Sequence, residues 1–172
     1  MDDFTLNEML EMRRKNISFQ EGDHKFNYRV CGIILHEGKI LAMQDERSPY
    51  YYLPGGRVKM GETAEQAILR EYSEELNITP EIIRPLWLNQ AFFTEDVDKL
   101  QYHELCLYFL LSGEGTGLFK MGEQFTLKER HHTHRFVWMP LEQLEKEFFY
   151  PLFLKKEIFH LPDSFTIRTE YE

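Results

Sequence analysis

One segment near the middle of the chain places three glutamates close to the C-terminal end of a predicted helix. Glu71, Glu74 and Glu75 stand at offsets of 0, +3 and +4, so at about 100° per residue their side chains share one sector of that helix. The i, i+4 pair repels by roughly 0.2 to 0.5 kcal/mol, and the negative end of the helix dipole adds several tenths of a kcal/mol. Because this clustering is unfavourable by itself, we expect a cation to balance it.

A divalent metal ion is the cation that best suits this cluster. Mg²⁺ and Mn²⁺ prefer hard oxygen ligands, and Mg²⁺ commonly binds substrate phosphates as well. The alternative is a solvated acidic face. The helical wheel favours the metal, because Ala64, Ala67 and Ile68 project from the same sector as the acids, so that face begins small and apolar before it becomes anionic.

Both ends of the helix are marked in the sequence. Thr63 and Gln66 have the spacing of a capping box, and Asn77 can take the left-handed position that follows a helix. The helix is therefore predicted over Ala64 to Leu76. Just before it, Gly55 and Gly56 allow turns and a close backbone approach.

The residues around this helix form a pattern that begins at Gly56, continues to Glu62 and ends in the run Arg70-Glu71-Tyr72-Ser73-Glu74-Glu75-Leu76-Asn77-Ile78, 23 residues in all. This pattern resembles the box of the Nudix (MutT-like) hydrolases. Two positions depart from the family pattern: Tyr72 replaces an aliphatic residue and Asn77 replaces a glycine. Neither change removes chemistry, since Tyr72 can still pack and asparagine tolerates the left-handed conformation.

The resemblance implies hydrolysis of a nucleoside diphosphate linked to another moiety, by in-line attack of metal-activated water. Mg²⁺ or Mn²⁺ would be held by Glu71, Glu74 and Glu75, and either Glu71 or Glu74 would also take the proton of the water. Arg70 would orient Glu71 or Glu74, although an exposed ion pair with Glu74 is an alternative. Glu62 would support the glycine loop or an outer-shell water.

Two other function classes stay open at this stage. One is a module of the same fold that senses a nucleotide or metabolite without cleaving it. The other is an RNA 5′-end pyrophosphohydrolase, for which Arg13, Arg14 and Lys15 offer a basic track. A net charge of −9 and a pI near 5.3 disfavour binding of long nucleic acid. A small nucleotide derivative is therefore the expected partner.

Further candidate site residues lie outside the box. Glu129 is the candidate for another metal ligand or base, with Glu123 as its competitor, and the nearby His131, His132 and His134 are expected to be solvated. Arg47 and Arg57 have guanidinium forks that suit phosphate oxygens, or are surface charges. Gly56 would approach the substrate, Glu104 would be an outer ligand, and the side chains of Tyr50, Tyr51 and Tyr52 are expected mainly in the core.

The remaining pattern predicts an α/β (α+β) protein, a Nudix-like α/β/α sandwich with a mixed central β-sheet. Residues 1–172 are expected to form one domain, with residues 1–16 as a helical appendage. Cys31 and Cys106 lie in apolar runs and are expected as free thiols. Without an apolar run near 18 residues or a signal peptide, the cytoplasm is the expected location, outside any membrane. A homodimer is a further expectation, since dimers are common among similar proteins.

Alternating and apolar runs predict strands at Ile17–Phe19, His24–His36, Lys39–Asp45, Pro49–Leu53, Arg84–Thr94, Gln101–Leu111, Arg135–Met139 and Phe165–Thr169. A long loop is predicted at Ser112–Arg130. Two further helices are predicted at Pro140–Glu147 and Tyr150–Leu161.

Overall fold

The acidic helix, α2, extends from Ala64 to Leu76 in the computed structural model, which describes residues 14–172. The Oγ1 of Thr63 accepts a hydrogen bond from the Gln66 N–H at 3.1 Å, and Gln66 Oε1 accepts one from the Thr63 N–H at 2.9 Å. Asn77 follows in the left-handed conformation, with φ 55°. The predicted bounds and both caps are confirmed. The predicted N-terminal helix falls almost entirely on residues 1–13, outside the described part.

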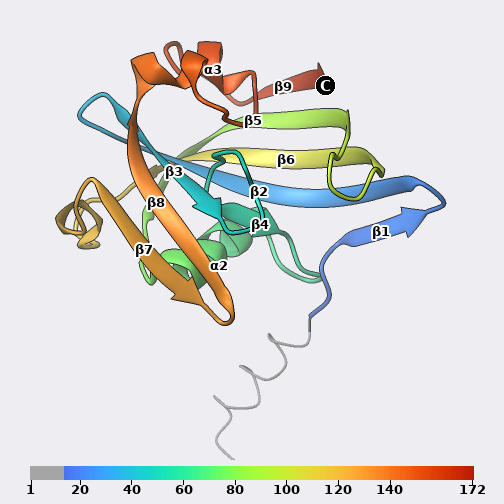
Figure 1. Ribbon diagram of the computed structural model, residues 1–172, viewed down its shortest axis with the longest axis horizontal. Coiled ribbons are helices and arrows are strands. Elements are labelled where there is room, and N and C mark those ends of the chain that lie inside the picture. The colour runs from blue at the N-terminus through green and yellow to red at the C-terminus, as the bar shows by residue number, and fades with distance from the viewer. Residues whose placement is uncertain (1–13) are drawn as a thin grey trace, which may run out of the picture.

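The strands of the described residues form one mixed sheet in the order β7-β8-β3-β2-β6-β5-β9, and β1 and β4 add to β2 (Figure 1). The pairs β2–β6 and β5–β9 are parallel and the other pairs are antiparallel. The strands are β1 (Ser18–Glu21), β2 (His24–His36), β3 (Lys39–Asp45), β4 (Gly55–Arg57), β5 (Glu81–Thr94), β6 (Gln101–Ser112), β7 (Gln124–Glu129), β8 (His132–Pro140) and β9 (Thr166–Tyr171).

Short helical segments cover the face of the sheet opposite α2. They are the 3₁₀ helix η2 (Leu141–Lys146) and the α-helix α3 (Leu154–Glu157). A separate 3₁₀ turn, η1 (Leu118–Lys120), precedes β7 and packs on the α2 side. In Figure 1, α2 lies below the sheet and α3 above it. The predicted sandwich with a mixed central sheet is confirmed, with short helices in its second outer layer. No helix of the described residues is long and apolar enough to cross a membrane.

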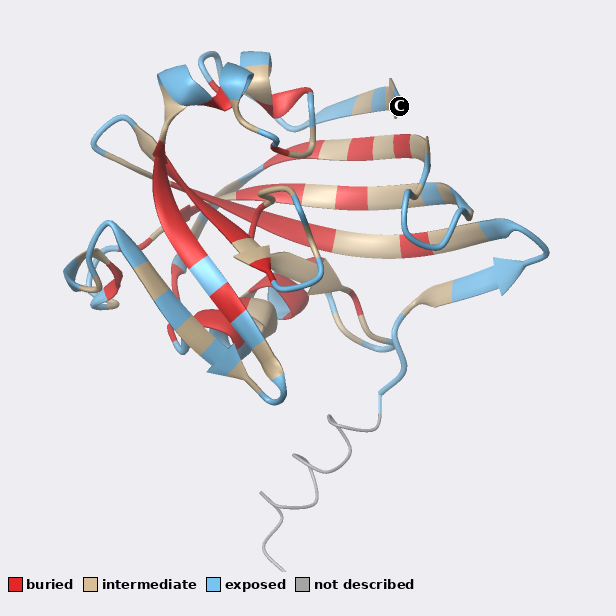
Figure 2. Cartoon of the chain, viewed as in Figure 1, coloured by how far each residue is buried: buried red, intermediate tan, exposed pale blue. Residues whose placement is uncertain are grey.

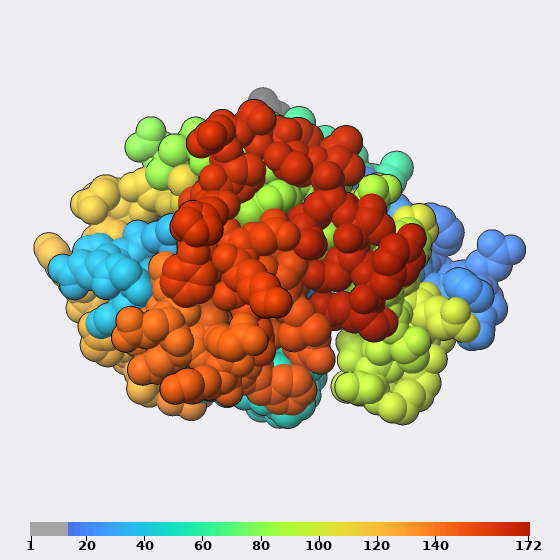
Figure 3. Space-filling model, turned by 90° about the horizontal axis from the view of Figure 1, so that it is seen from above, coloured from blue at the N-terminus to red at the C-terminus, as the bar shows by residue number. Residues whose placement is uncertain are grey.

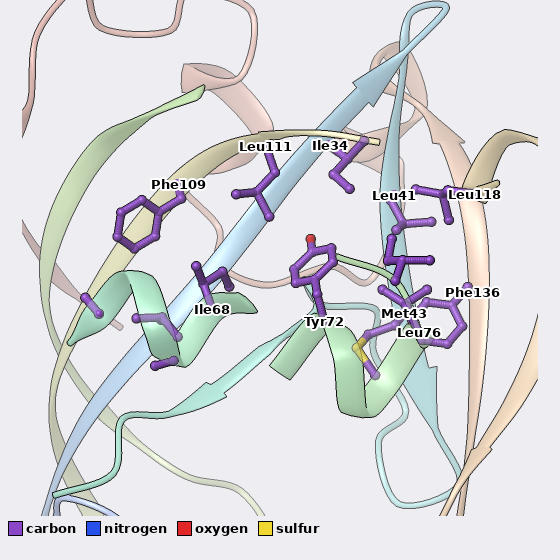
Figure 4. Packing of buried hydrophobic residues seen from close by; sticks show 14 of the residues in the cluster. Ile34, Leu41, Met43, Ile68, Tyr72, Leu76, Phe109, Leu111, Leu118 and Phe136 are labelled. Atoms are coloured by element: carbon purple, nitrogen blue, oxygen red, sulfur yellow. The ribbon is translucent and has the colours of Figure 1, made fainter. Parts of the chain in front are cut away.

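Two hydrophobic clusters fill the space on either side of the sheet. On one side α2 buries Ile68, Tyr72 and Leu76 against the sheet, and Figure 4 shows the Tyr72 ring projecting from the helix toward Leu111. The other cluster includes Trp87 and lies under η2 and α3. Figure 2 shows buried positions along β2, β5, β6 and β8, whereas β1 and β9 are mostly exposed.

Tyr72 fits its position because a glycine faces it. A Cβ on Gly32 would lie 2.6 Å from the Tyr72 hydroxyl and would contact Leu111. The ring is completely buried, so the expectation that Tyr72 still packs is confirmed. The two cysteines, Cys31 and Cys106, are buried free thiols, as predicted, with their Sγ atoms 3.6 Å apart.

The prediction of a strand over Pro49–Leu53 was wrong. Only Tyr51 and Tyr52 form bridges there, with Phe149 and Met43 respectively. The strand that leads to α2 is β4, built from the glycines themselves. Gly55 pairs with Cys31 and comes so close to β2 that an added Cβ would overlap the Val30 carbonyl oxygen. Only glycine permits this approach.

The prediction of one long loop over Ser112–Arg130 was also wrong, because β7 occupies its second half. The glycines lie before this strand, whereas Gln124–Glu129 alternates exposed with partly buried residues. Phe125 and Leu127 pack on the core beside α2, which fixes the strand against β8. The expected helix over Pro140–Glu147 is a 3₁₀ helix, and the expected helix over Tyr150–Leu161 is reduced to α3.

Candidate active site

Gly56 and Glu71 meet where β4 passes the middle of α2. A Cβ on Gly56 would overlap the carboxylate of Glu71. The missing side chain is therefore what allows the Glu71 carboxylate to lie against the glycine loop. This brings together the first and fourth of the six box residues, which are 15 positions apart in the sequence.

Arg70 connects four residues of the box. Its Nε donates to Glu62 Oε1 at 2.6 Å and its Nη2 donates to Glu62 Oε2 at 3.0 Å. Nη1 donates to Glu71 Oε1 at 2.7 Å and to Glu74 Oε2 at 3.2 Å. A further bond, to the Arg57 carbonyl at 3.0 Å, ties the helix to β4. Arg70 is thus much more than an exposed partner of Glu74.

Glu62 is the most enclosed partner of this arginine. Its side chain is only 4% exposed, and Oε2 also accepts the N–H of Lys59 at 2.9 Å. Burial alone would raise the pKa of Glu62, but the hydrogen bonds from Arg70 and the Lys59 N–H lower it below its ordinary value. The carboxylate therefore stays charged and holds both the loop and the guanidinium, and its role in the reaction stays a prediction.

Glu75 is the carboxylate of the cluster that makes no ion pair with the described residues. Its residue is buried, and Oε2 has no hydrogen-bond partner among the described residues. Burial, and after it the charges of Glu71 and Glu129, raise the pKa of Glu75 well above its ordinary value. Burial also raises the pKa of Glu71, although Arg70 opposes that shift.

The donor set fits a hard divalent cation. Three carboxylates lie on one turn, and the Oε2 of Glu75 is a buried oxygen that lacks a partner. In this structure, no three acidic, histidine or cysteine side chains of residues 14–172 lie close enough together to hold an ion. Because Arg70 bonds to both Glu71 and Glu74, these two carboxylates would have to turn from it to share an ion with Glu75.

Glu129 reaches the same region from the end of β7. Its charge acts on Glu75, and its Oε2 lies 3.0 Å from the Nε2 of His134. Its competitor, Glu123, precedes the other end of β7 and pairs with Lys39 Nζ at 2.8 Å. The structure therefore brings Glu129, and not Glu123, to the box glutamates.

The three histidines near Glu129 do not share one environment. His131 is exposed, and His132 lies 3.3 Å from Glu46. His134 is buried, and its Nδ1 has no hydrogen-bond partner among the described residues. The expectation that all three are solvated was wrong for His134. It lies on β8 two positions before the core residue Phe136, and both side chains are on the buried face of the strand.

Arg47, Arg57 and Glu104, the candidates for substrate or outer-ligand contacts outside the helix, lie in different surroundings. Arg47 is 65% exposed and pairs with Asp45 at 2.9 Å. Arg57 lies on β4 directly beside Arg29 of β2. Glu104 accepts a long hydrogen bond of 3.5 Å from Asn27 Nδ2 and lines a cavity next to the box.

This cavity has a volume of about 530 Å³. Its mouth can be followed in Figure 3 as a notch between the yellow-green turn after β5 and the orange segment before α3. Its floor is formed by strands of the sheet, and its walls carry aromatic rings, including those of Tyr50 and Tyr150, 5.0 Å apart. The lining residues are Arg29, Cys31, Ser48, Tyr50, Tyr52, Leu53, Asn89, Ala91, Phe93, Thr94, Glu95, Asp96, Glu104, Tyr108, Tyr150, Pro151, Glu170 and Glu172.

Arg29 is the lining residue that sequence reasoning missed. Its Nε is buried without a hydrogen-bond partner, and its charge acts on both Glu71 and Glu75. The signal was present in the sequence, because Arg29 is a cation next to the apolar run that begins at Val30. Arg29 and Cys31 are two positions apart on β2, so both face the cavity.

Comparison with known proteins gives matches of two kinds. Residues 25–158 match the NUDIX domain model. A stretch of 56 residues is 41% identical to an ADP-ribose pyrophosphatase of Methanocaldococcus jannaschii, covering 31% of this chain and 33% of that protein. A stretch of 28 residues is 61% identical to an 8-oxo-dGTP diphosphatase of Escherichia coli K12, covering 16% and 22%. The chain thus aligns with a third or less of the length of these relatives.

Two solved structures share the fold. A MutT protein from Bacillus halodurans aligns with a TM-score of 0.61 at 19% identity, over 83% of this chain and 89% of that one. An ADP-ribose pyrophosphatase from Streptococcus suis aligns with a TM-score of 0.53 at 16% identity, over 83% and 98%. Since the NUDIX match extends over most of the sequence and includes the whole box, the chain belongs to the Nudix family.

Proposed function

We propose that this chain is a Mg²⁺- or Mn²⁺-dependent hydrolase that cleaves the pyrophosphate bond of a nucleoside diphosphate linked to another moiety. The observation that supports this most is the Oε2 of Glu75, a carboxylate oxygen buried without a partner beside Glu71. Burying an unbalanced charge is costly, and a divalent ion would remove that cost. Membership of the Nudix family supports the reaction class.

In this proposal Glu71, Glu74 and Glu75 hold the ion. A bound divalent ion would polarise the phosphorus and lower the pKa of a bound water. Glu71 or Glu74 takes the proton of the attacking water. Arg70 acts as a positioning residue, because it bonds to both of these carboxylates and is itself fixed by the two oxygens of Glu62.

Glu129 is proposed as a further ligand or base. The hydrogen bond to the buried His134 fixes its carboxylate, and its charge reaches Glu75. Gly56 contributes space, since any side chain there would displace Glu71. Arg57 is paired with Arg29, which lines the cavity, and its guanidinium would suit a phosphate there. Arg47, held by Asp45 and largely exposed, is the weaker candidate for substrate binding.

The cavity beside the box is proposed to take the rest of the substrate. Its volume of about 530 Å³ is within the range of about 300 to 1,000 Å³ that is usual for small-molecule sites. Glu104 faces the cavity from β6, so in this proposal it lines the substrate site, and its role as an outer metal ligand stays a prediction. Cytoplasmic location and a homodimeric state remain predictions, which cell fractionation and light scattering would test.

The test compares wild type with Glu74→Gln and Glu75→Gln. Purified proteins are incubated with Mg²⁺ or Mn²⁺ and a panel of nucleoside triphosphates, nucleotide sugars, ADP-ribose, dinucleoside polyphosphates and 5′-triphosphorylated RNA, and the products are identified. Both variants are expected to fold normally and to lose several orders of magnitude in turnover. Glu65→Gln, the same change on the exposed start of α2, is the control. Wild-type turnover in both variants, or nucleotide binding without any metal-dependent product, would contradict the proposal.

A further inference from the structure

The charges on the cavity floor change sign from one end to the other. On β2, Arg29 lies beside Arg57 of β4 and Cys106 of β6. Farther across the sheet, Glu104 of β6 pairs with Ala91 of β5, and Ala91 pairs with Glu170 of β9. The floor therefore begins with a cation next to the box glutamates and ends with carboxylates at the far edge of the sheet.

The cationic end lacks a partner within the protein. The guanidinium of Arg29 makes no hydrogen bond or ion pair with residues 14–172, and its Nε is inaccessible to solvent. Glu104 acts on it only at longer range. Arg29 as a whole is partly buried, so the cost of lacking a partner falls on the enclosed Nε, and the planar fork suits phosphate oxygens. Arg29 is paired across the strands with Arg57, the neighbour of Gly56, and Gly56 lies against the Glu71 carboxylate, so a phosphate bound there would lie near the box.

The acidic end offers hydrogen-bond acceptors. Glu172 is hydrogen-bonded to Glu170 and accepts the N–H of Leu152 at 3.4 Å. Glu170 is paired with Arg168 at 3.3 Å. Even when one proton is shared between the two carboxyl groups, the pair keeps a negative charge and free lone pairs. It would attract amino groups and repel carbonyl oxygens.

The walls between these ends suit a flat ring. The ring of Tyr50 packs edge to face against that of Tyr150, with an interplanar angle of 80°. Phe93, on β5, also lines the cavity. Aromatic side chains of this kind stack on nucleobases. Among the bases, adenine and cytosine carry an exocyclic amino donor where hypoxanthine and uracil carry a carbonyl oxygen, and carboxylates accept from such amino groups.

We propose that the cavity selects amino-bearing nucleotides and binds them in one orientation, with a phosphate at Arg29 and the amino edge of the base at Glu170 and Glu172. This inference rests on the proposed function, since it places the base of the same substrate. Arg29 then supplies affinity that is independent of the base. Glu172 supplies the choice between bases.

Binding of nucleoside monophosphates tests this without any turnover. Isothermal titration calorimetry at pH 7.5 with the full chain would compare AMP with IMP and CMP with UMP. Each pair exchanges an amino group for a carbonyl and, at the adjacent ring nitrogen, an acceptor for an N–H donor. Wild type is expected to bind the amino-bearing member about tenfold more tightly, the usual effect of one hydrogen bond to a charged group. Adenosine, which has no phosphate, is expected to bind at least tenfold more weakly than AMP.

Two variants separate the ends of the cavity. Arg29→Met is expected to weaken AMP and IMP by the same factor of about ten or more, and to leave adenosine binding unchanged. Glu172→Leu is expected to bring the AMP/IMP and CMP/UMP ratios close to one without weakening IMP or UMP. The matched controls are Arg135→Met and Glu114→Leu, both on exposed positions away from the cavity, and neither is expected to change any affinity.

Equal affinities for AMP and IMP in wild type would overturn the inference, as would an AMP/IMP ratio unchanged by Glu172→Leu or an AMP affinity unchanged by Arg29→Met. If Arg29→Met does not fold, equal binding of AMP and adenosine to wild type overturns the role of Arg29 instead. These results are independent of the hydrolysis test. A protein that hydrolyses the panel but binds AMP and IMP equally keeps the proposed function and loses this orientation.

Discussion

Replacing Glu75 with glutamine should stabilise the metal-free protein, although the same change is expected to lower turnover. The Glu75 side chain is buried and its Oε2 has no partner among the described residues. A buried polar group left unsatisfied costs about 1 to 3 kcal/mol, and more when it is charged. Glutamine keeps an unsatisfied polar group there and removes only the excess due to the charge, on the order of 1 kcal/mol. At roughly 2 to 4 °C per kcal/mol for a chain of this size, Glu75→Gln should raise the melting temperature by about 2 to 4 °C.

The gain should depend on pH in a defined direction. In the folded protein the pKa of Glu75 lies well above its ordinary value of 4.5. A carboxyl group with a raised pKa in the folded state favours folding while it is protonated, so wild type should lose stability as the pH rises through that folded pKa. Glu75→Gln cannot ionise there. The difference in melting temperature should therefore be larger at pH 8 than at pH 5.

Differential scanning fluorimetry in EDTA, at both pH values, would measure the effect. Adding Mg²⁺ at about 100 times its Kd should then stabilise wild type by about 2.7 kcal/mol and leave Glu75→Gln nearly unchanged, so that the order of the two proteins narrows or reverses. Glu65→Gln, on the exposed side of α2, should stay within about 0.5 kcal/mol of wild type. A Glu75→Gln protein that melts at or below wild type in EDTA at pH 8 would refute this reasoning.

Three further substitutions test the surroundings of the box. Arg70→Ala leaves the nearly inaccessible Glu62 carboxylate without its cation and should cost about 3 to 5 kcal/mol in urea denaturation; a loss below about 1 kcal/mol would contradict the bidentate pairing. Asn77 has φ 55°, so Asn77→Ala should destabilise by about 1 kcal/mol and Asn77→Gly should not, and equal melting temperatures for the two would argue against a left-handed residue. Tyr72→Phe removes a buried hydroxyl without a partner in the described structure and should be neutral or stabilising by about 1 kcal/mol, which thermal melting can check.

The sequence predicts α2 and its surroundings well because the determinants there are local. The capping box needs only Thr63 and Gln66, and the left-handed cap needs only Asn77. The spacing of the box glutamates fixes which side of the helix they share. The sequence could not give their different burial, with Glu75 enclosed and Glu74 35% exposed, because this depends on what packs against the helix.

The elements that were missed depend on partners distant in the sequence. Tyr50 to Tyr52 have strand-like residues, yet their bridges go to Met43 and Phe149 separately, and no local pattern indicates this. The β7 strand was missed because the glycines just before it suggested a loop, although the residues of β7 itself alternate between polar and apolar. The proximity of Arg29 to Glu71 arises from the pairing of β2 with β4, which only the fold determines.

The same physical feature explains why this site costs stability and why it suits a substrate complex. Arg70 neutralises part of the acidic cluster through Glu62, Glu71 and Glu74, but it makes no contact with Glu75. The guanidinium of Arg29 has no hydrogen bond or ion pair with the described residues. The buried Glu75 carboxylate and the partly buried Arg29 guanidinium are thus both left without a direct partner in this part of the chain. A metal ion at the first and a phosphate at the second would satisfy both, and a metal-bound diphosphate carries these two groups in a single ligand.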